Sequence, residues 1–221
     1  MMTMMPAWTM MATPSQGADF AHEQAAVERG LGPVCGIDEA GRGPWAGPVV
    51  AAAVILAPGN IPNGLADSKT LSKQRREALF AKLSQSASIG VGRAEVGEID
   101  EFNILGATML AMARAVADLD VPPNHALVDG NRPPDLPCGV ECLVKGDARC
   151  LSIAAASIVA KVSRDREMAA LAERFPGFGW ERNAGYGTAE HQAALARLGP
   201  NQIHRRSFAP IRKLLQHPVS G

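Results

Sequence analysis

Residues 49–57 form the longest apolar run of the sequence, VVAAAVILA, and this run limits the folds open to the chain. It has about half of the roughly 20 residues that a membrane-spanning helix needs, so it is interpreted as a buried strand. Of the 221 residues, 47% are hydrophobic and 20% are charged. This composition supports one sizeable core and excludes disordered and collagen-like chains. The chain is therefore expected to contain one globular domain, with no membrane association.

Strand-like and helix-like segments alternate along the sequence. Residues 34–38 and 49–56 are apolar and are separated by a Gly- and Pro-rich turn, so they are predicted to be strands that pair as a hairpin. Further strands are predicted at residues 88–95, 125–129 and 141–144. Helices are predicted at residues 72–82, 99–119, 150–175, 188–198 and 210–216, the first of them capped by Ser72. This order predicts an α/β layered domain with a mixed sheet and a helical carboxyl end.

The amino-terminal residues differ from the rest of the chain. Residues 1–32 are expected to form a mobile tail and lead-in, and residues 33–221 a single domain that includes the carboxyl-terminal helices. The first 20 residues contain no Lys or Arg before their weakly apolar stretch. A secretory signal needs a positively charged start, so secretion is not expected.

The four cysteines are Cys35, Cys138, Cys142 and Cys150. They show no paired C-x-x-C spacing and no regularly spaced histidines accompany them, so a zinc site is not expected. Reduced thiols are the ordinary state in the cytoplasm, which is the expected location.

The net charge of zero conceals an asymmetry along the chain. Residues 1–144 hold 10 Lys and Arg against 16 Asp and Glu, whereas residues 145–221 hold 12 against 6. A basic carboxyl third can attract phosphates by releasing their counterions. The charge pattern alone fits equally well a basic helix surface that faces only solvent.

Three aspartates stand at or just after the ends of apolar runs: Asp38 in VCGIDEAG, Asp129 in ALVDGN and Asp147 in CLVKGD. The carboxyl ends of strands are where sites form in open α/β sheets, so these acids are expected to converge, although a single strand-end Asp is usually a turn or cap residue. Glu39 follows Asp38 directly, and the strand must end there if both are to face one site, because neighbouring strand residues point to opposite faces. Clustered carboxylates favour Mg²⁺ or Mn²⁺ and phosphodiester hydrolysis.

The loop Gly41-Arg42-Gly43 follows these acids at once. Its glycines let the backbone approach a phosphate or a sugar closely, and Arg42 can hold a phosphate. Such loops are common as simple turns, so the pattern alone does not assign a function. The same holds for the segments that contain Ser68 with Lys69 and Lys145 with Asp147.

Taken together, six blocks resemble the type 2 ribonucleases H, most closely the bacterial ribonuclease HII group. The resemblance covers about residues 33–214, in order and at the spacing of the family. The blocks are GIDEAGRGPWAGPVVAAAVIL, LADSKTLS, IDEFNILGATMLAM, ALVDGNRPP, VKGDARCLSIAAASIVAKVSRDREM and GYGTAEHQAALARLGPNQIHRRSF.

The resemblance implies a three-layer ribonuclease H-like fold, with a central mixed five-stranded sheet and a carboxyl-terminal helical extension that grips the duplex. It implies a monomeric endonuclease that needs Mn²⁺ or Mg²⁺. Such an enzyme hydrolyses the RNA strand of RNA–DNA hybrids and incises 5′ to single ribonucleotides embedded in duplex DNA. The cut leaves a 3′-hydroxyl and a 5′-phosphate, which fits a role in ribonucleotide excision repair and DNA replication.

The resemblance also assigns roles to single residues. The metal-binding, catalytic acids are Asp38, Glu39, Asp129 and Asp147. The reader of the ribose 2′-hydroxyl is the loop Gly41, Arg42 and Gly43, and Tyr186 stacks on the sugar that follows the ribonucleotide. Contacts to backbone phosphates, or to positions near the scissile group, are implied for Ser68, Lys69, Asn103 and Lys145. His191, His204, Arg205 and Arg206 lie in matching blocks, where a substrate contact and a structural role remain open.

Two departures from the family pattern are visible: Trp45 stands where an aliphatic residue is expected, and the methionine-rich head has no counterpart. The sister type, ribonuclease HIII, carries an additional amino-terminal domain, for which about 32 residues are too few. Two other functions remain as alternatives: a junction-resolving DNA nuclease on the same fold, and a hybrid-binding protein without catalysis.

Overall fold

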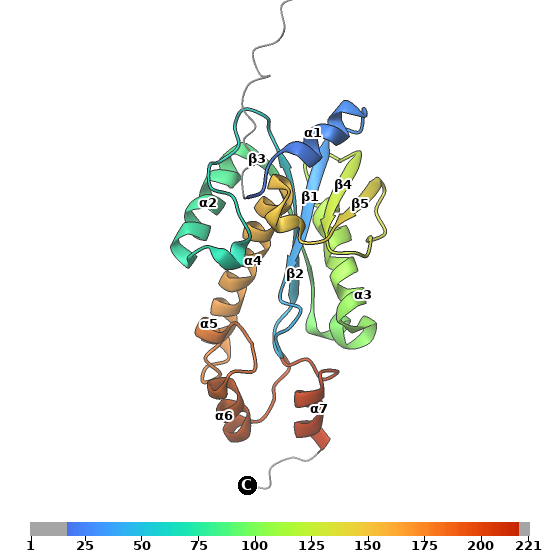
Figure 1. Cartoon of the computed structure of the whole chain (residues 1–221). Coiled ribbons are helices and arrows are strands. Elements are labelled where there is room, and N and C mark those ends of the chain that lie inside the picture. Colours follow the sequence, from blue (N-terminus) through green and yellow to red (C-terminus); the bar gives the residue numbers. More distant parts are fainter. Residues whose placement is uncertain (1–16, 217–221) are drawn as a thin grey trace, which may run out of the picture.

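The computed structural model describes residues 17–216, and they form a five-stranded sheet with helices on both faces (Figure 1). The strands are β1 (Val34–Ala40), β2 (Val49–Leu56), β3 (Ala87–Ala94), β4 (His125–Asp129) and β5 (Gly139–Leu143). Their order in the sheet is β3-β2-β1-β4-β5. β1 pairs antiparallel with β2, and β2 with β3, whereas β4 runs parallel to β1 and β5 parallel to β4. The predicted α/β fold with a mixed sheet and a leading hairpin is confirmed.

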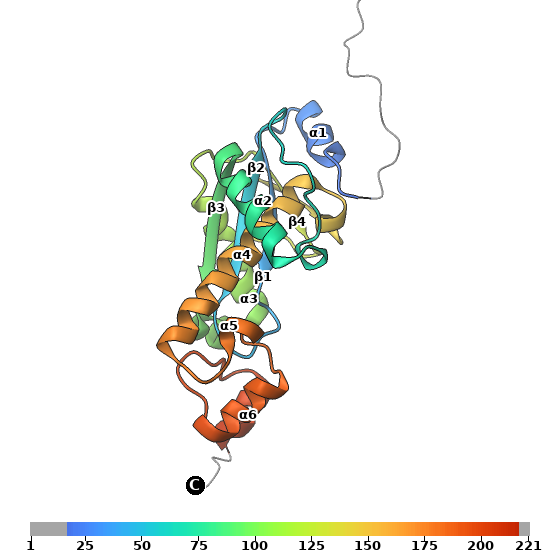
Figure 2. The same cartoon turned by 90° about the vertical axis from the view of Figure 1, so that its left-hand side faces the viewer.

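One long helix covers each face of the sheet. The longer helices are α2 (Lys73–Ser86), α3 (Val96–Ala117) and α4 (Leu151–Arg174). The shorter helices are α1 (Ala21–Glu28), α5 (Trp180–Asn183), α6 (Ala189–Leu198) and α7 (Ala209–Gln216). Two single 3-10 turns are η1 (Ser68–Thr70) and η2 (Gly146–Ala148). α3 packs on one face and α4, with α2 beside it, on the other, while α5, α6 and α7 extend beyond one end of the sheet (Figures 1 and 2). No helix in the described part of the chain is long and apolar enough to cross a bilayer.

The apolar run of β2 is buried on both faces. Ala51 and Ala53 belong to the hydrophobic cluster on the α3 side, and Ala52 and Val54 to the cluster on the α4 side. This alternation follows from the two-residue period of a strand. It explains why the run is apolar throughout, because neither face of β2 reaches water.

β1 approaches α4 very closely at Gly36. A Cβ atom at this position would lie 2.2 Å from the backbone carbonyl carbon of Ser152. Any side chain would therefore push the helix away from the sheet. Close packing here sets the distance between α4 and the end of β1, which carries Asp38.

The expected tail contains a helix that the sequence patterns did not predict. Residues 1–16 lie outside the described residues, but residues 21–28 form α1. Glu23 of α1 is 2% exposed, and its Oε1 accepts hydrogen bonds from the Ser152 backbone N–H at 2.6 Å and from the Cys150 thiol at 3.1 Å. Cys150 is the N-cap residue of α4 and gives no side-chain cap of its own. Glu23 therefore caps α4 from a distant part of the sequence.

This cap predicts that Glu23→Ala destabilises the protein by about 1–3 kcal/mol, because the mutation leaves a buried backbone donor without its acceptor. In a chain of this size, that loss lowers Tm by roughly 2–4 °C per kcal/mol. The matched control is Glu28→Ala, on the exposed side of the same helix, with an expected effect within about 0.5 kcal/mol. Equal losses for the two variants in denaturant unfolding would rule out the capping role.

Candidate active site

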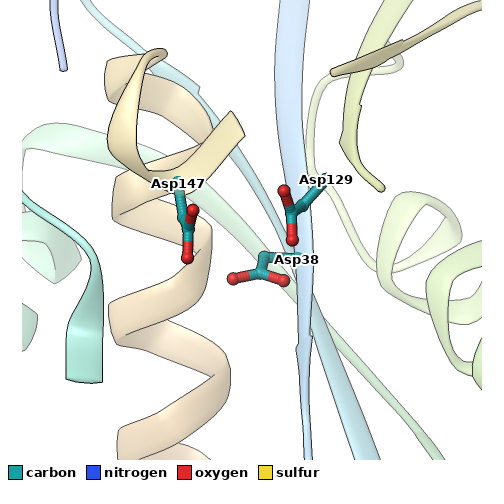
Figure 3. Close-up of side chains that lie close together, drawn as sticks. All are labelled: Asp38, Asp129 and Asp147. Atoms are coloured by element: carbon teal, nitrogen blue, oxygen red, sulfur yellow. The ribbon is translucent and has the colours of Figure 1, made fainter. Parts of the chain in front are cut away.

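Three aspartates from separate segments converge beside the carboxyl ends of β1 and β4. Asp38 lies on β1, Asp129 ends β4, and Asp147 lies in η2. One carboxylate oxygen from each lies within 4.8 Å of the others, and Figure 3 shows the three carboxylates turned toward one another. β1 and β4 are parallel neighbours, so their carboxyl ends meet at one edge of the sheet. The sequence positions of these acids predicted this convergence.

Glu39 lies on the opposite face of β1 from Asp38. β1 continues to Ala40, so the expectation that the strand ends at this pair of acids is wrong. In the hairpin, Asp38 pairs with Ala52 on the α4 side and Glu39 pairs with Ala51 on the α3 side, which keeps the strand regular. Glu39 is therefore outside the group of three, although it borders the same end of the sheet.

Burial and neighbouring negative charge raise the pKa values of Asp38, Glu39 and Asp147. Asp38 is 4% exposed, and burial, followed by the charges of Glu39 and Asp129, raises its pKa well above the ordinary value. Burial, followed by Asp129, raises the pKa of Asp147. Burial also raises the pKa of Glu39, against the opposing effect of Arg42. The group therefore favours the binding of protons or of cations.

The donor set fits a hard divalent cation. The backbone N–H groups of Glu39 and Gly146 donate to Asp38 Oδ1 and Asp129 Oδ1, each at 2.7 Å, which fixes the two carboxylates. Lys69 Nζ lies 3.8 Å from Asp147 Oδ2 and offsets part of the negative charge. Carboxylate oxygens without imidazole or thiolate ligands are the preference of Mg²⁺ and Mn²⁺ rather than of softer metals.

The loop between β1 and β2 rests on two buried guanidinium groups. Arg164 and Arg205 are 1% and 0% exposed. Their N–H groups donate to the carbonyls of Gly41, Arg42, Ala46, Gly47 and Pro48. Burial lowers the pKa of both groups, that of Arg205 to about 9. The loop carbonyls thus replace the water that these cations lose on folding. The same hydrogen bonds hold the loop in one conformation.

Gly41 is the position where this support requires a glycine. Its φ of 98° is in the left-handed region, and a Cβ atom there would lie 1.9 Å from Arg164 Nε. A larger residue would displace the guanidinium group as well as strain the backbone. The glycine is therefore required by the buried arginine beneath the loop.

Tyr186 lies opposite the other end of the loop. A Cβ atom at Gly43 would lie 3.3 Å from Tyr186 Cε1, and the tyrosine is 47% exposed. A cavity of about 440 Å³ lies between them, and its lining residues include Glu39, Arg42 and Lys69. Arg42 NH1 lies 3.2 Å from Glu39 Oε1. The loop, the tyrosine and one of the acids therefore share one cavity.

Ser68 and Lys69 occupy different environments. Ser68 is 4% exposed, and its Oγ lies 2.9 Å from Ser157 Oγ on α4. A hydrogen bond with Ser157 in turn lowers the raised pKa of Asp38. The side chain of Lys69 is 78% exposed and lines the cavity. Ser68 thus supports the acids from within the protein, and Lys69 is the accessible member of the pair.

Asn103 and Lys145 do not line this cavity, and both have positive φ angles, of 59° and 56°. Asn103 interrupts α3, and its Oδ1 accepts from the backbone N–H groups of Leu105 and Gly106, which starts the second part of the helix. Lys145 is the N-cap residue of η2, the turn that carries Asp147. The structure gives both residues a local role in shaping the backbone.

The sequence patterns missed the polar face of α4. Ser157, Lys161 and Arg164 follow one another at helical spacing within an otherwise apolar helix, and all three line the cavity. This spacing was a usable signal, because polar residues on one face of a buried helix require a partner.

Comparison with known proteins identifies the family of the chain. The family model described as ribonuclease HII matches residues 35–211. The chain is 64% identical to the ribonuclease HII of Parvibaculum lavamentivorans, over 82% of this chain and 68% of that protein. It is 59% identical to the ribonuclease HII of Jannaschia sp., over 90% of this chain and 98% of that protein. The crystal structure of the ribonuclease H2 from Pyrococcus horikoshii OT3 superposes with a TM-score of 0.69 at 30% identity, over 83% of this chain and 97% of that one. The chain therefore belongs to the ribonuclease HII family of metal-dependent endonucleases, which cut the RNA of RNA–DNA hybrids.

Proposed function

We propose that this enzyme incises duplex DNA on the 5′ side of single embedded ribonucleotides, besides cutting the RNA strand of hybrids, and that it leaves a 3′-hydroxyl and a 5′-phosphate. The observation that carries the proposal is the shared cavity, in which the Gly41-to-Gly43 loop and Tyr186 face each other and Glu39, the neighbour of Asp38 in sequence, lines the wall. This arrangement combines a reader of the sugar with a centre for phosphodiester hydrolysis.

The loop is suited to reading the ribose 2′-hydroxyl, the group that distinguishes RNA from DNA. Gly41 and Gly43 carry no side chain that would keep a sugar away from the backbone. The two buried arginines hold the loop in place before a substrate binds, so little ordering remains to be done at binding. A single ribonucleotide then provides enough contact to select the cleavage site.

Tyr186 is suited to stacking on the next sugar. It is the only tyrosine in the chain, it stands in a turn between Gly185 and Gly187, and it is half-exposed toward the cavity. Core packing does not account for an aromatic ring in this position. A ring that faces the loop across the cavity can report whether the neighbouring nucleotide has an RNA or a DNA sugar.

Asp38, Glu39, Asp129 and Asp147 would hold Mg²⁺ or Mn²⁺. When bound, two such ions would supply an activated water and stabilise the leaving oxygen in phosphodiester hydrolysis. Asp38, Asp129 and Asp147 fit this role by their proximity, and Glu39, on the other face of β1 and outside this group, would add the fourth carboxylate. Lys69 and Arg42, which line the cavity, are placed to bind backbone phosphates. Ser68 supports the acids from within the protein, and Asn103 and Lys145, both exposed, would contact backbone phosphates.

The basic carboxyl third would grip the duplex as it leaves the cavity. Residues 145–221 carry a net charge of +6, and α6 and α7 extend beyond the end of the sheet near which the loop lies (Figure 1). All four cysteines are free, which fits a reducing cytoplasm. We infer that the enzyme acts there as a monomer.

The first prediction concerns substrate choice. The enzyme cuts a duplex with one ribonucleotide and leaves the matching all-DNA duplex intact. Tyr186→Ala lowers kcat/KM on the first duplex by roughly 5- to 150-fold, because stacking of one base or sugar on an aromatic ring contributes about 1–3 kcal/mol. Tyr186→Phe keeps the ring and serves as the matched control. Equal cleavage of both duplexes by the unmodified enzyme would refute the proposed substrate.

A second prediction concerns the acids in the absence of metal. The pKa of Asp38 is raised in the folded state, so the folded protein binds protons more tightly than the unfolded chain. The contribution of Asp38 to stability is then fully present near and below the unfolded pKa of 3.8, and the metal-free protein loses this contribution as the pH rises toward the folded pKa. At pH 8, Asp38→Asn therefore raises Tm without metal, by roughly 2–4 °C per kcal/mol of relieved repulsion.

Calorimetry with and without Mn²⁺ checks this expectation. The unmodified enzyme gains Tm on adding the metal, whereas Asp38→Asn loses most of this gain and loses cleavage. Asp120→Asn, on an exposed position, is the control and leaves both quantities unchanged. An Asp38→Asn protein that still cleaves at the normal rate contradicts the assignment.

A further inference from the structure

A pair of fully buried histidines connects the turn of Tyr186 to the segment that ends in Arg205. His191 lies on α6 and His204 just before Arg205, and both are 0% exposed. Their Nε2 atoms lie 3.1 Å apart, enclosed by the rings of Phe178 and Trp180. Both histidines are enclosed and do not line the cavity, so their surroundings favour a structural role over a substrate contact.

The carbonyl of Tyr186 fixes the position of one proton on His191. His191 Nδ1 lies 2.9 Å from the carbonyl oxygen of Tyr186, which can only accept, so this nitrogen carries a proton. In the neutral ring Nε2 is then an acceptor, and it receives hydrogen bonds from Trp180 Nε1 and from His204 Nε2. His204 Nδ1 is left as an acceptor for the backbone N–H of Asn201 at 3.0 Å.

In this arrangement each ring carries one proton, which matches the lowered pKa values of both histidines. Burial lowers the pKa of His191, and burial together with His191 lowers the pKa of His204 to about 4. Glu190 is the charged side chain that raises the pKa of His191. Asn201 Oδ1, at 2.9 Å from His204 Nδ1, faces the nitrogen that would take up a proton in acid. At neutral pH the Asn201 backbone N–H donates to His204, His204 donates to His191, and His191 donates to the Tyr186 carbonyl.

The histidine pair is connected to supports on two sides of the cavity, through the hydrogen bond to Tyr186 and through the residue that follows His204. At one end, His191 holds the carbonyl of Tyr186. At the other, Arg205 follows His204 directly and donates to the carbonyls of Gly41 and Arg42. The tyrosine and the glycine loop come from parts of the chain that are more than 140 residues apart by number, and the histidine pair connects their supports.

Trp45 makes a second connection between the same parts. Its backbone N–H donates to the Gly185 carbonyl at 2.8 Å, and its carbonyl accepts from the Arg205 N–H at 2.8 Å. Its ring packs on Gly187, where a Cβ atom would lie 2.2 Å from Trp45 Cζ2. The aromatic residue that departs from the expected pattern thus fills the space beneath the turn of Tyr186.

We propose that His191 and His204 are positioning residues that fix the Tyr186 ring relative to the Gly41-to-Gly43 loop and so set the selectivity of cleavage. This inference rests on the proposed function, because it concerns how the enzyme selects the embedded ribonucleotide as its cleavage site. A site must be held to within about 0.5 Å of its working geometry, and a misplacement of about 1 Å can cost roughly 10²-fold in rate. Tyr186 stands in a glycine-flanked turn, which supplies little rigidity of its own.

Three substitutions separate the two connections of His191. The side-chain amide of His191→Asn reaches as far as Nδ1 and keeps the hydrogen bond to Tyr186, but it loses the connection to His204. The amide of His191→Gln reaches as far as Nε2, so it keeps the connection to His204 but loses the hydrogen bond to Tyr186. His204→Gln keeps a donor toward His191 and is the conservative variant. Gln202→Ala, an exposed neighbour, is the control.

The first measurement is a double-mutant cycle with Tyr186→Ala on the duplex that contains one ribonucleotide. His191→Asn and His191→Gln are each expected to lower kcat/KM by about 10-fold or more, up to roughly 10²-fold, and His204→Gln by less. When Tyr186 is already alanine, the same substitutions add about 2-fold or less, because the group they position is gone. Full additivity would overturn the proposal, because it would show a role in general folding. Variants of both His191 and His204 that fail to fold would do the same.

The second measurement does not depend on cleavage. Tyr186 is the only tyrosine, so labelling tyrosine rings with ¹³C gives the signal of one residue in the full-length enzyme. The His191 variants are expected to shift this signal and to increase the mobility of the ring, whereas Gln202→Ala leaves it unchanged. An unchanged ring signal in both His191 variants refutes the positioning role. If the ring signal changes but the unmodified enzyme cuts all-DNA and ribonucleotide-containing duplexes equally, the positioning stands and the proposed function fails.

Discussion

The site depends on the hydrogen bonds from two buried arginines to the carbonyls of the loop between β1 and β2. Arg164 comes from α4 and Arg205 from the segment before α7, so the loop is held between elements that are distant in sequence. A buried guanidinium group without partners would cost several kcal/mol. Here each cation is surrounded by carbonyls, so the cost of burying it is offset only when the loop has its native shape. The loop geometry and the folding of the carboxyl-terminal third are therefore coupled.

The acids impose the opposite constraint. Asp38 and Asp147 are buried next to Asp129, and their raised pKa values show that the charged forms are disfavoured without a cation. The scaffold tolerates this repulsion because rigid elements surround it: Gly36 brings α4 against β1, and Glu23 caps the start of α4 a few residues after Asp147. Functional sites often lower the stability of a fold. Here the repulsion between the carboxylates is the unfavourable interaction, and a bound metal ion would offset it.

The sequence predicted the fold and the acids from local signals, because strand ends and helix caps depend on near neighbours. Ser72, for example, caps α2 as expected, and β4 has the predicted bounds. What depends on distant contacts could not be predicted in this way. The regular continuation of β1 through Glu39 follows from its pairing with β2, and α1 is anchored through Glu23 to α4. The buried roles of Arg205 and His204 likewise depend on partners more than ten residues away.

The central claim is that the metal centre supplies the chemistry and that the loop, held by buried arginines, supplies the choice of cleavage site. Arg205→Lys tests it most directly, because a lysine keeps the charge but cannot form the fork of hydrogen bonds to the loop carbonyls. The ratio of cleavage at an embedded ribonucleotide to cleavage of all-DNA duplex is measured together with Mn²⁺ affinity by titration calorimetry. We expect the ratio to fall about 10-fold or more while the affinity for Mn²⁺ stays within about 2-fold. A parallel loss of both, or an unchanged ratio in a folded variant, would contradict the account.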